Sequence, residues 1–181
     1  MISRKGQVWI MDVTVSLILF SAAAIIAFNI LLNTFSSNTS FGELKKDAIK
    51  ISEYLLAEGT PADWDETTII RPGLATLGRI NESKVTLGMN MTNASYEAMK
   101  PRLQTLHDFL VVFEGSDGDL IEFGDFCTFG SPDVDVNYTL TPSLDCHYLN
   151  FTSTVYDDLV VINRFAVYDS SIVRMVVYVW G

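Results

Sequence analysis

Four acidic residues stand close together in the middle of the chain, and carboxylates at such spacing are candidates for metal binding. They are Glu114, Asp117, Asp119 and Glu122. Calcium is a hard cation that prefers several carboxylate and carbonyl oxygens, but these residues do not fit the register of an EF-hand loop. The Asp-Gly pair within 115–119 is typical of a hairpin turn, so we interpret the cluster as a solvated turn.

Cysteine and histidine are the other candidates for chemistry. The chain has two of each: Cys127, Cys146, His107 and His147. Zinc sites usually contain a Cys-x-x-Cys pair, which this sequence lacks, and a serine or cysteine nucleophile needs a histidine and an orienting acid beside it. The sequence also contains no Gly-x-Ser-x-Gly, phosphate-loop or dinucleotide-binding motif. We therefore expect no enzymatic activity, no metal and no cofactor.

The two cysteines are better suited to a structural role. Cys127 and Cys146 both lie in the C-terminal part of the chain, and an even count in an oxidising compartment favours one disulfide. Such a bridge would close a loop of about 20 residues and stabilise the fold by about 3 kcal/mol. The alternative of two free buried thiols stays open on the sequence alone.

Charge and asparagine sequons indicate the class of protein. The formal net charge is −10 and there is no basic stripe, which argues against nucleic acid as a partner. Six of the nine asparagines begin an Asn-x-Ser/Thr sequon: Asn38, Asn81, Asn90, Asn93, Asn137 and Asn150. This excess predicts a glycosylated surface outside the cell, unless the pairs simply reflect loop composition.

An uncharged apolar run from Val13 to Leu32 dominates the N-terminal part. At 1.5 Å per residue, twenty helical residues span about 30 Å, the thickness of the hydrocarbon core of a bilayer. Arg4 and Lys5 precede the run and favour a cytoplasmic N-terminus with the C-terminal part outside. A cleaved secretory signal ending near Ala22–Ala24 is the alternative, but the run continues apolar beyond it.

The helical pattern continues past the membrane span. A polar interruption at residues 33–40 predicts a bend or a short break, after which Ser40 is a candidate N-cap. An amphipathic helix follows, with an apolar stripe of Leu44, Ala48, Ile51 and Leu55. We expect Gly59 and Pro61 to end it.

The remaining chain predicts a mostly antiparallel sheet. Residues 109–113 and 120–123 flank the Asp-Gly turn and predict one hairpin, and residues 159–168 and 172–180 predict a second, with its turn at 169–170. A helix is expected over residues 93–106, kinked or split at Pro101, with Tyr96, Met99, Leu103 and Leu106 on one face. Residues 124–156 look irregular. The fold class is therefore α+β: one long N-terminal helix, with a transmembrane first half and an amphipathic second half, packed on a mostly antiparallel sheet.

The residues around the apolar run resemble a known type of leader. The order Arg4-Lys5-Gly6-Gln7, then Asp12, then the apolar run resembles the class III signal peptides of archaeal type IV pilin-like proteins. The resemblance implies that a prepilin peptidase cuts between Gly6 and Gln7 and leaves the helix on the mature chain. It further implies that Asp12 neutralises the freed amine of a neighbouring subunit. The acid of the family usually stands fifth after the cut, whereas Asp12 stands sixth.

Weaker similarities to archaeal pilin-like surface proteins occur further along. They are Gly59-x-Pro61-x-x-Trp64, Gly73-Leu74 and the closing Val179-Trp180. The implied organisation is a cleaved basic leader at 1–6, a helix at 7–58 with its span at about 13–32, and an exterior α+β domain at 59–181.

The function that the resemblance implies is structural or adhesive. The chain would be a major or minor pilin in a cell-surface filament, with membrane lipid, prepilin peptidase and identical or related pilin subunits as partners. The alternative is a signal-anchored exterior protein that binds a partner and never polymerises; an exterior enzyme ranks third.

Overall fold

The computed structural model describes two compact units, which comprise residues 1–42 and 43–181. We call the second unit the C-terminal domain. The backbone is described over residues 4–139, 145–150 and 156–181. Within these ranges the side chains are described except at 4–10, 33–40, 135–139, 145, 147, 148 and 150.

Helix α1 (Arg4–Leu56) is continuous through residues 33–40. The expected break in this stretch, with Ser40 as an N-cap, is therefore wrong. Serine, threonine and asparagine lower helix propensity by only a few tenths of a kcal/mol each, which is too little to stop a helix that continues on both sides.

The amphipathic part of α1 buries the stripe that its sequence predicts. Leu44, Ala48, Ile51 and Leu55 are all buried in the main core of the C-terminal domain. Their spacing of three and four residues places them on one side of the helix, so a single stripe can be covered by a sheet.

Within the described residues, the domain also contains two further helices and eight strands. These are α2 (Glu82–Ala94), α3 (Tyr96–Arg102), β1 (Ala75–Thr76), β2 (Arg79–Ile80), β3 (Asp108–Glu114), β4 (Phe129–Gly130), β5 (Asp135–Thr139), β6 (Asp145–Asn150), β7 (Leu159–Tyr168) and β8 (Ser171–Trp180). The main sheet has the order β1-β2-β7-β8-β3-β4, and all its pairs are antiparallel except β2 with β7. The α+β class and the mostly antiparallel sheet are confirmed.

Strands β7 and β8 form the second predicted hairpin in full register, from Leu159 opposite Trp180 to Tyr168 opposite Ser171. The two turn residues, Asp169 and Ser170, have φ values of 42° and 65°. Two consecutive positive φ angles are typical of the type I′ turn, whose twist matches that of the strands it joins.

The first predicted hairpin is largely wrong. Strand β3 pairs along its whole length with β8 and briefly with β4. Residues 120–123 form one bridge to β3, between Leu120 and Glu114, and Phe123 then pairs with Phe126 instead. After that bridge Phe123 is buried, and its ring lies 5.1 Å from the ring of Phe113. Burial of this ring takes the chain away from the edge of β3.

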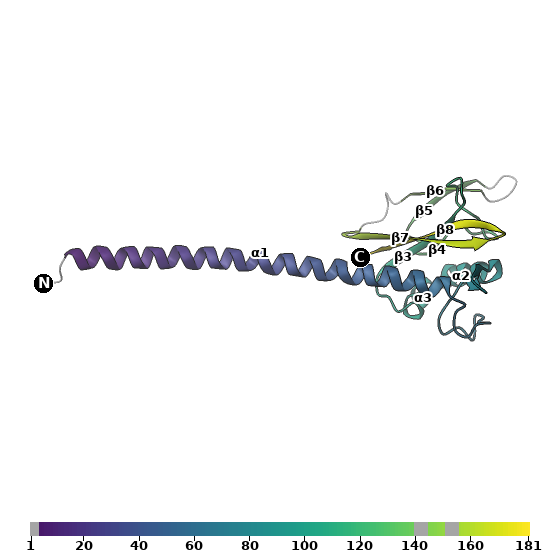
Figure 1. Cartoon of the computed structure of the whole chain (residues 1–181), viewed down its shortest axis with the longest axis horizontal. Helices are drawn as coiled ribbons and strands as arrows, with labels where there is room; N and C mark the ends of the chain where they lie inside the picture. Colours follow the sequence, from purple (N-terminus) through teal and green to yellow (C-terminus); the bar gives the residue numbers. More distant parts are fainter. Residues whose placement is uncertain (1–3, 140–144, 151–155) are drawn as a thin grey trace. The chain divides into compact units, whose positions relative to one another are not determined.

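The region that looked irregular, residues 124–156, contains β4 and the two-stranded β5–β6 sheet. This sheet lies on the opposite side of the main sheet from α1, α2 and α3 (Figure 1). Beneath it a small second core joins Leu110, Val112, Val176 and Trp180 to Val134. The main sheet is thus covered on both faces.

The helix expected at 93–106 is also displaced. The structure has α2 ending at Ala94 and α3 ending at Arg102, and Leu106 lies beyond both, almost fully exposed, instead of on the buried face. The left-handed φ of 54° at Gln104 interrupts any helical continuation. Met99 and Leu103 are buried, as expected.

Two glycines bring the chain back against the end of α1. Gly59 has φ +87°, and a Cβ on Gly73 would lie 2.1 Å from the Gly59 nitrogen and 2.4 Å from the Ala57 carbonyl oxygen. The Trp64 Nε1 donates a hydrogen bond of 2.9 Å to the Gly73 carbonyl, and Leu74 N donates one of 2.7 Å to Leu55 O. We call residues 57–74 the glycine corner. It satisfies the carbonyl of Leu55, which the end of the helix would otherwise leave unpaired.

We expect Gly73→Ala to destabilise the domain by about 3 kcal/mol or more, because the added methyl meets backbone atoms that cannot move aside. The control is Gly42→Ala, where the added Cβ meets nothing within 4 Å and alanine favours the helix. Thermal unfolding of the full chain in detergent, followed by circular dichroism, measures both. Equal stability of the Gly73→Ala chain and the wild type would contradict this role of the corner.

Candidate functional site

The residues of the leader lie at the start of α1. Gly6 and Gln7 belong to the helix, and their side chains lie outside the described residues. Asp12 is exposed. The structure therefore leaves both the processing site and the charge role of Asp12 as predictions.

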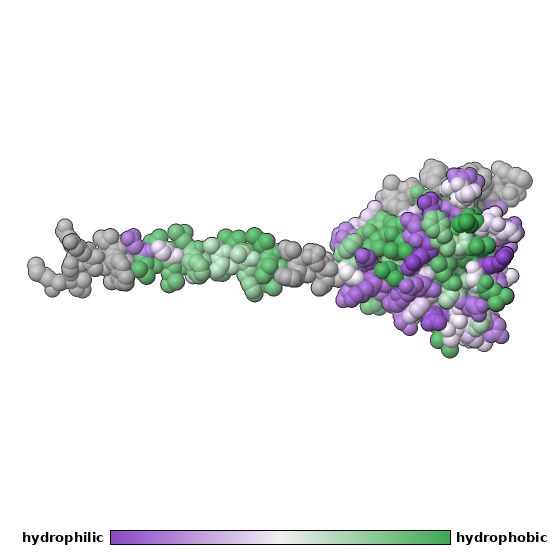
Figure 2. All heavy atoms as spheres, in the orientation of Figure 1, coloured by the Kyte–Doolittle hydropathy of each residue, from purple (hydrophilic) through white to green (hydrophobic). Residues whose placement is uncertain are grey.

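The stretch Met11–Leu32 is long and apolar enough to cross a membrane, and its side chains are exposed along the whole stretch. Large exposed residues point in every direction around the helix, such as Leu17, Ile18, Leu19 and Phe20. Figure 2 shows this stretch as predominantly apolar. A helix that is apolar all round is unsuited to water and suits lipid or other apolar helices.

Two polar side chains in this stretch are satisfied by the helix itself. Thr14 Oγ1 donates to Met11 O at 2.9 Å, and Asn29 Nδ2 donates to Ile25 O at the same distance. A polar group in hydrocarbon needs an internal partner, because lipid offers none. These polar residues are therefore compatible with an apolar surrounding.

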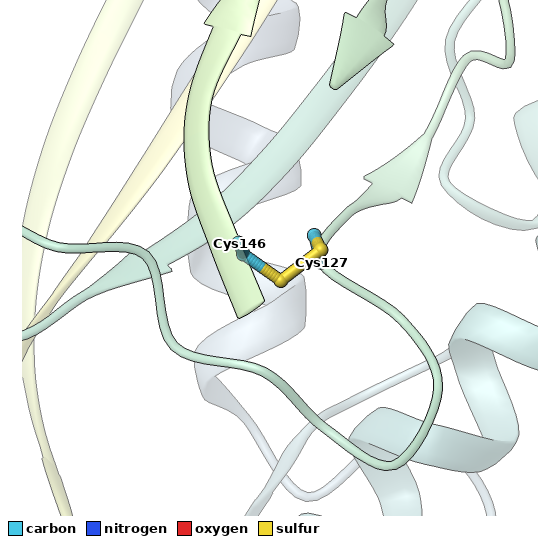
Figure 3. Close-up of a disulfide and its surroundings, with 2 residues drawn as sticks. All are labelled: Cys127 and Cys146. Carbon is cyan, nitrogen blue, oxygen red and sulfur yellow. A yellow bond between two sulfur atoms is a disulfide. The ribbon is translucent and has the colours of Figure 1, made fainter. Parts of the chain in front are cut away.

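Cys127 and Cys146 form a disulfide with a Cα–Cα distance of 5.8 Å, which confirms the predicted bridge (Figure 3). It joins the start of β6 to the segment just before β4 and so holds the β5–β6 sheet to the main sheet. Because both sulfurs are used in the bridge, they are not available as thiolate ligands of zinc.

Residues 115–119, which we call the acidic turn, form a turn, as their Asp-Gly pair predicts. Gly115 N donates to Asp119 O at 2.9 Å, and Gly118 N donates to Gly115 O. Glu114 forms an ion pair with Arg174 of β8. Among the described residues, no three His, Cys, Asp or Glu side chains are grouped as a metal site would require.

The sequons that the structure describes differ in how they present the asparagine. Asn81 caps α2: its Oδ1 accepts from Lys84 N, and its Nδ2 donates to Thr76 Oγ1 at 3.1 Å. Asn90 is exposed, but Thr92 of its sequon is buried and donates to Gly88 O. Asn93 and Ser95 of its sequon are both exposed. The side chains of Asn38, Asn137 and Asn150 lie outside the described residues.

A polar cluster that sequence reasoning missed lies where α1 meets the start of β3. Asp47 accepts hydrogen bonds from Lys50 Nζ and Thr105 Oγ1, both at 2.8 Å, and its Oδ2 lies 3.0 Å from His107 Nδ1. Burial raises the pKa of Asp47, but these three partners outweigh it and hold the pKa below 3.8. The cluster joins residues 58 and 60 positions apart, so no local spacing reveals it.

A second polar anchor lies beside the glycine corner. Lys84 Nζ donates to the carbonyls of Glu58, Ala62 and Ala75 at 2.8, 2.7 and 3.1 Å. Desolvation lowers the pKa of this lysine. One ammonium thus ties the end of α1 to α2, which is a structural rather than a catalytic role.

The candidate residues of the described chain therefore do not converge on a catalytic centre. The cysteines are bonded to each other, His107 pairs with Asp47, and the acidic turn faces outward. What stands out is the apolar helix and a domain braced by a disulfide and by two polar clusters, around Asp47 and around Lys84. Comparison of the chain with protein-family models, curated proteins and solved structures finds no match.

We expect Asp47→Asn to destabilise the domain by about 1–3 kcal/mol at neutral pH, because it weakens charge-assisted hydrogen bonds from three partners. Since the folded pKa lies below the unfolded value, the stabilisation is present above about pH 3.8 and is lost as the pH falls through the folded pKa. Urea unfolding across pH should show the wild type and the variant converging in acid. Asp125→Asn, at an exposed carboxylate, is the matched control; a difference from wild type that does not vary with pH would contradict the linkage.

Proposed function

We propose that this chain is an archaeal type IV pilin-like subunit with a structural or adhesive role in a cell-surface filament. Its apolar helix spans the membrane before assembly and packs against the helices of identical or related subunits afterwards. The C-terminal domain lies outside the cell. Membrane lipid and a prepilin peptidase are its other partners, and nucleic acid is not one.

The observation that carries the proposal is the fully exposed apolar stretch Met11–Leu32 directly after Arg4-Lys5-Gly6-Gln7. A peptidase that cuts after Gly6 on the cytoplasmic side leaves such a helix intact, whereas an ordinary signal peptidase removes it. The small residues of the run, among them Ala22, Ala23 and Ala27, allow helices to approach closely.

Three features support an exterior location for the domain. Arg4 and Lys5 favour a cytoplasmic N-terminus. The Cys127–Cys146 disulfide is typical of an oxidising compartment. The excess of sequons fits a glycosylated surface. Each of these also fits an anchored surface protein that never polymerises, so the experiments below separate the two functions.

Processing is the first test. We expect the mature chain to begin at Gln7, because glycine at position 6 admits the peptidase, and Gly6→Val to leave the full-length precursor in the membrane. N-terminal sequencing and intact mass of protein from membranes and sheared filaments measure this. The control Ala24→Val, at the alternative small-residue cluster, should leave the start at Gln7. A native start at Met1 or after Ala24 would remove the main support for the pilin function.

Assembly is the second test. An unpaired charge in an apolar bundle is costly, so Asp12→Ala, which leaves the amine of an adjacent Gln7 without its partner, should cost about 3 kcal/mol per contact. We expect filaments to be lost while the domain folds normally. Electron microscopy of sheared material measures the first and thermal unfolding the second. Glu43→Ala, at another exposed acid of α1, is the control. Normal filaments from Asp12→Ala cells would rule out charge pairing.

Glycosylation is the third test. If sugar is added to the folded domain, Asn93 should be modified more completely than Asn81, whose amide already caps α2, or Asn90, whose Thr92 is buried. Peptide mass spectrometry of native protein measures the occupancy at each asparagine. Occupied Asn81 beside unmodified Asn93 would contradict transfer to the folded domain, and no sugar at any sequon would contradict the glycosylated surface.

A further inference from the structure

An apolar side chain is held out into solvent at one end of the sheet. Leu106 is 93% exposed, in the loop of residues 103–107 that leads into β3, which we call the Leu106 loop. The loop is rigidly held: Thr105 N donates to Lys100 O, Thr105 Oγ1 donates to Asp47, and Lys50 Nζ donates to Gln104 O. An ordered loop has already lost the freedom that binding would otherwise cost.

A pocket with two exposed apolar side chains lies at the other end of the same sheet. Its cavity of about 370 Å³ is formed by the acidic turn and the β7–β8 hairpin, and it is lined by Gly115, Ser116, Asp117, Gly118, Phe165, Ile172 and Arg174. Phe165 and Ile172 are 72% and 68% exposed. We call it the β7–β8 pocket. It is large enough for a leucine side chain, and covering Phe165 and Ile172 would remove apolar surface from water, which is favourable.

The register of the sheet keeps the loop and the pocket apart within one chain. Asp108, two residues after Leu106, pairs with Trp180, whereas Glu114, next to the pocket, pairs with Arg174. Six residue steps of β3 correspond to about 20 Å. The neighbouring Thr105 and Gln104 hold the Leu106 loop to α1 at its own end, so Leu106 cannot reach the pocket of its own chain.

The charges at the two ends are complementary. At the loop end Lys100 already pairs with Glu97 and Asp108, so the positive charge that faces a partner comes from Arg102. At the pocket end Arg174 lines the pocket and pairs with Glu114, so the negative charge that faces a partner comes from the exposed Asp117 and Asp119 of the turn. Opposite charges favour the encounter of these two ends and disfavour contact between like ends.

We propose that the Leu106 loop of one copy of this chain docks in the β7–β8 pocket of a second copy. This rests on the proposed function, because copies inserted in one membrane share one orientation. A contact between different patches on identically oriented copies is head-to-tail, so it repeats from copy to copy and builds a ring or an open chain of subunits. The contact gives the C-terminal domains an assembly interface of their own, separate from the apolar helices.

Cross-linking of the full chain in native membranes tests the contact. Leu106→Cys and Ile172→Cys are made in separate chains, both at exposed positions, and the two are co-produced and treated with a short bis-maleimide. We expect a cross-linked heterodimer only when both are present. A chain with both changes should give a ladder of dimer, trimer and larger species. Leu77→Cys, an equally apolar residue that is 87% exposed on the β1–β2 turn, replaces Leu106→Cys in the control and should give no product.

The outcomes separate the contact from the filament. No product from the Leu106 and Ile172 pair, or equal product from the Leu77 control, overturns the contact, even if the protein is found in filaments. A product that stops at the dimer overturns the head-to-tail arrangement. A ladder in membranes without filaments supports the contact and counts against the filament. Arg102→Glu should lower the yield severalfold and Arg79→Glu should not; equal effects would overturn the charge argument.

Discussion

The C-terminal domain depends on the burial of one apolar stripe on α1. Leu44, Ala48, Ile51 and Leu55 contact the inner face of the sheet and the residues that follow the helix, and all four lie in the main core. Burying a side chain of this size stabilises a fold by about 1.5–3 kcal/mol. A single stripe needs a single sheet face, and the long β7–β8 hairpin with β3 provides it. The stripe of the helix and this face of the sheet therefore bury each other in one core.

The chain after α1 has to turn back at once to cover that stripe, and the glycine corner makes this possible. Gly73 lies so close to Gly59 that no side chain fits between them. Trp64 closes the corner by a hydrogen bond to the Gly73 carbonyl. Lys84 then ties the same corner to α2. Residues that looked like a weak family similarity in the sequence thus have a direct steric reason.

Sequence alone predicted the elements whose signal is local. The stripe of α1, the β7–β8 hairpin and the disulfide each follow from spacing within a short segment or from a count of two, and each is confirmed. The partner of β3 could not be predicted in this way, because its residues pair with residues of β8 that lie 60 to 72 positions later, and not with the segment just after the turn. The Asp47 cluster could not be predicted for the same reason, because Asp47 and His107 lie 60 positions apart. Both depend on which distant segments the core brings together.

The exposed position of Leu106 is the most instructive difference between the structure and the prediction from the sequence. Helical spacing from Met99 and Leu103 placed it on a buried face, but Gln104 takes a left-handed conformation and the chain leaves the helix before Leu106. Three polar contacts with α1 and α3 then hold the loop in that shape. Each partner lies in residues 43–181, as do the stripe, the corner and the sheet. Because none of these contacts involves the apolar stretch, the domain has what it needs to fold independently of it. Changes in the apolar stretch therefore leave these contacts in place, and changes in the domain act on its own stability and surface.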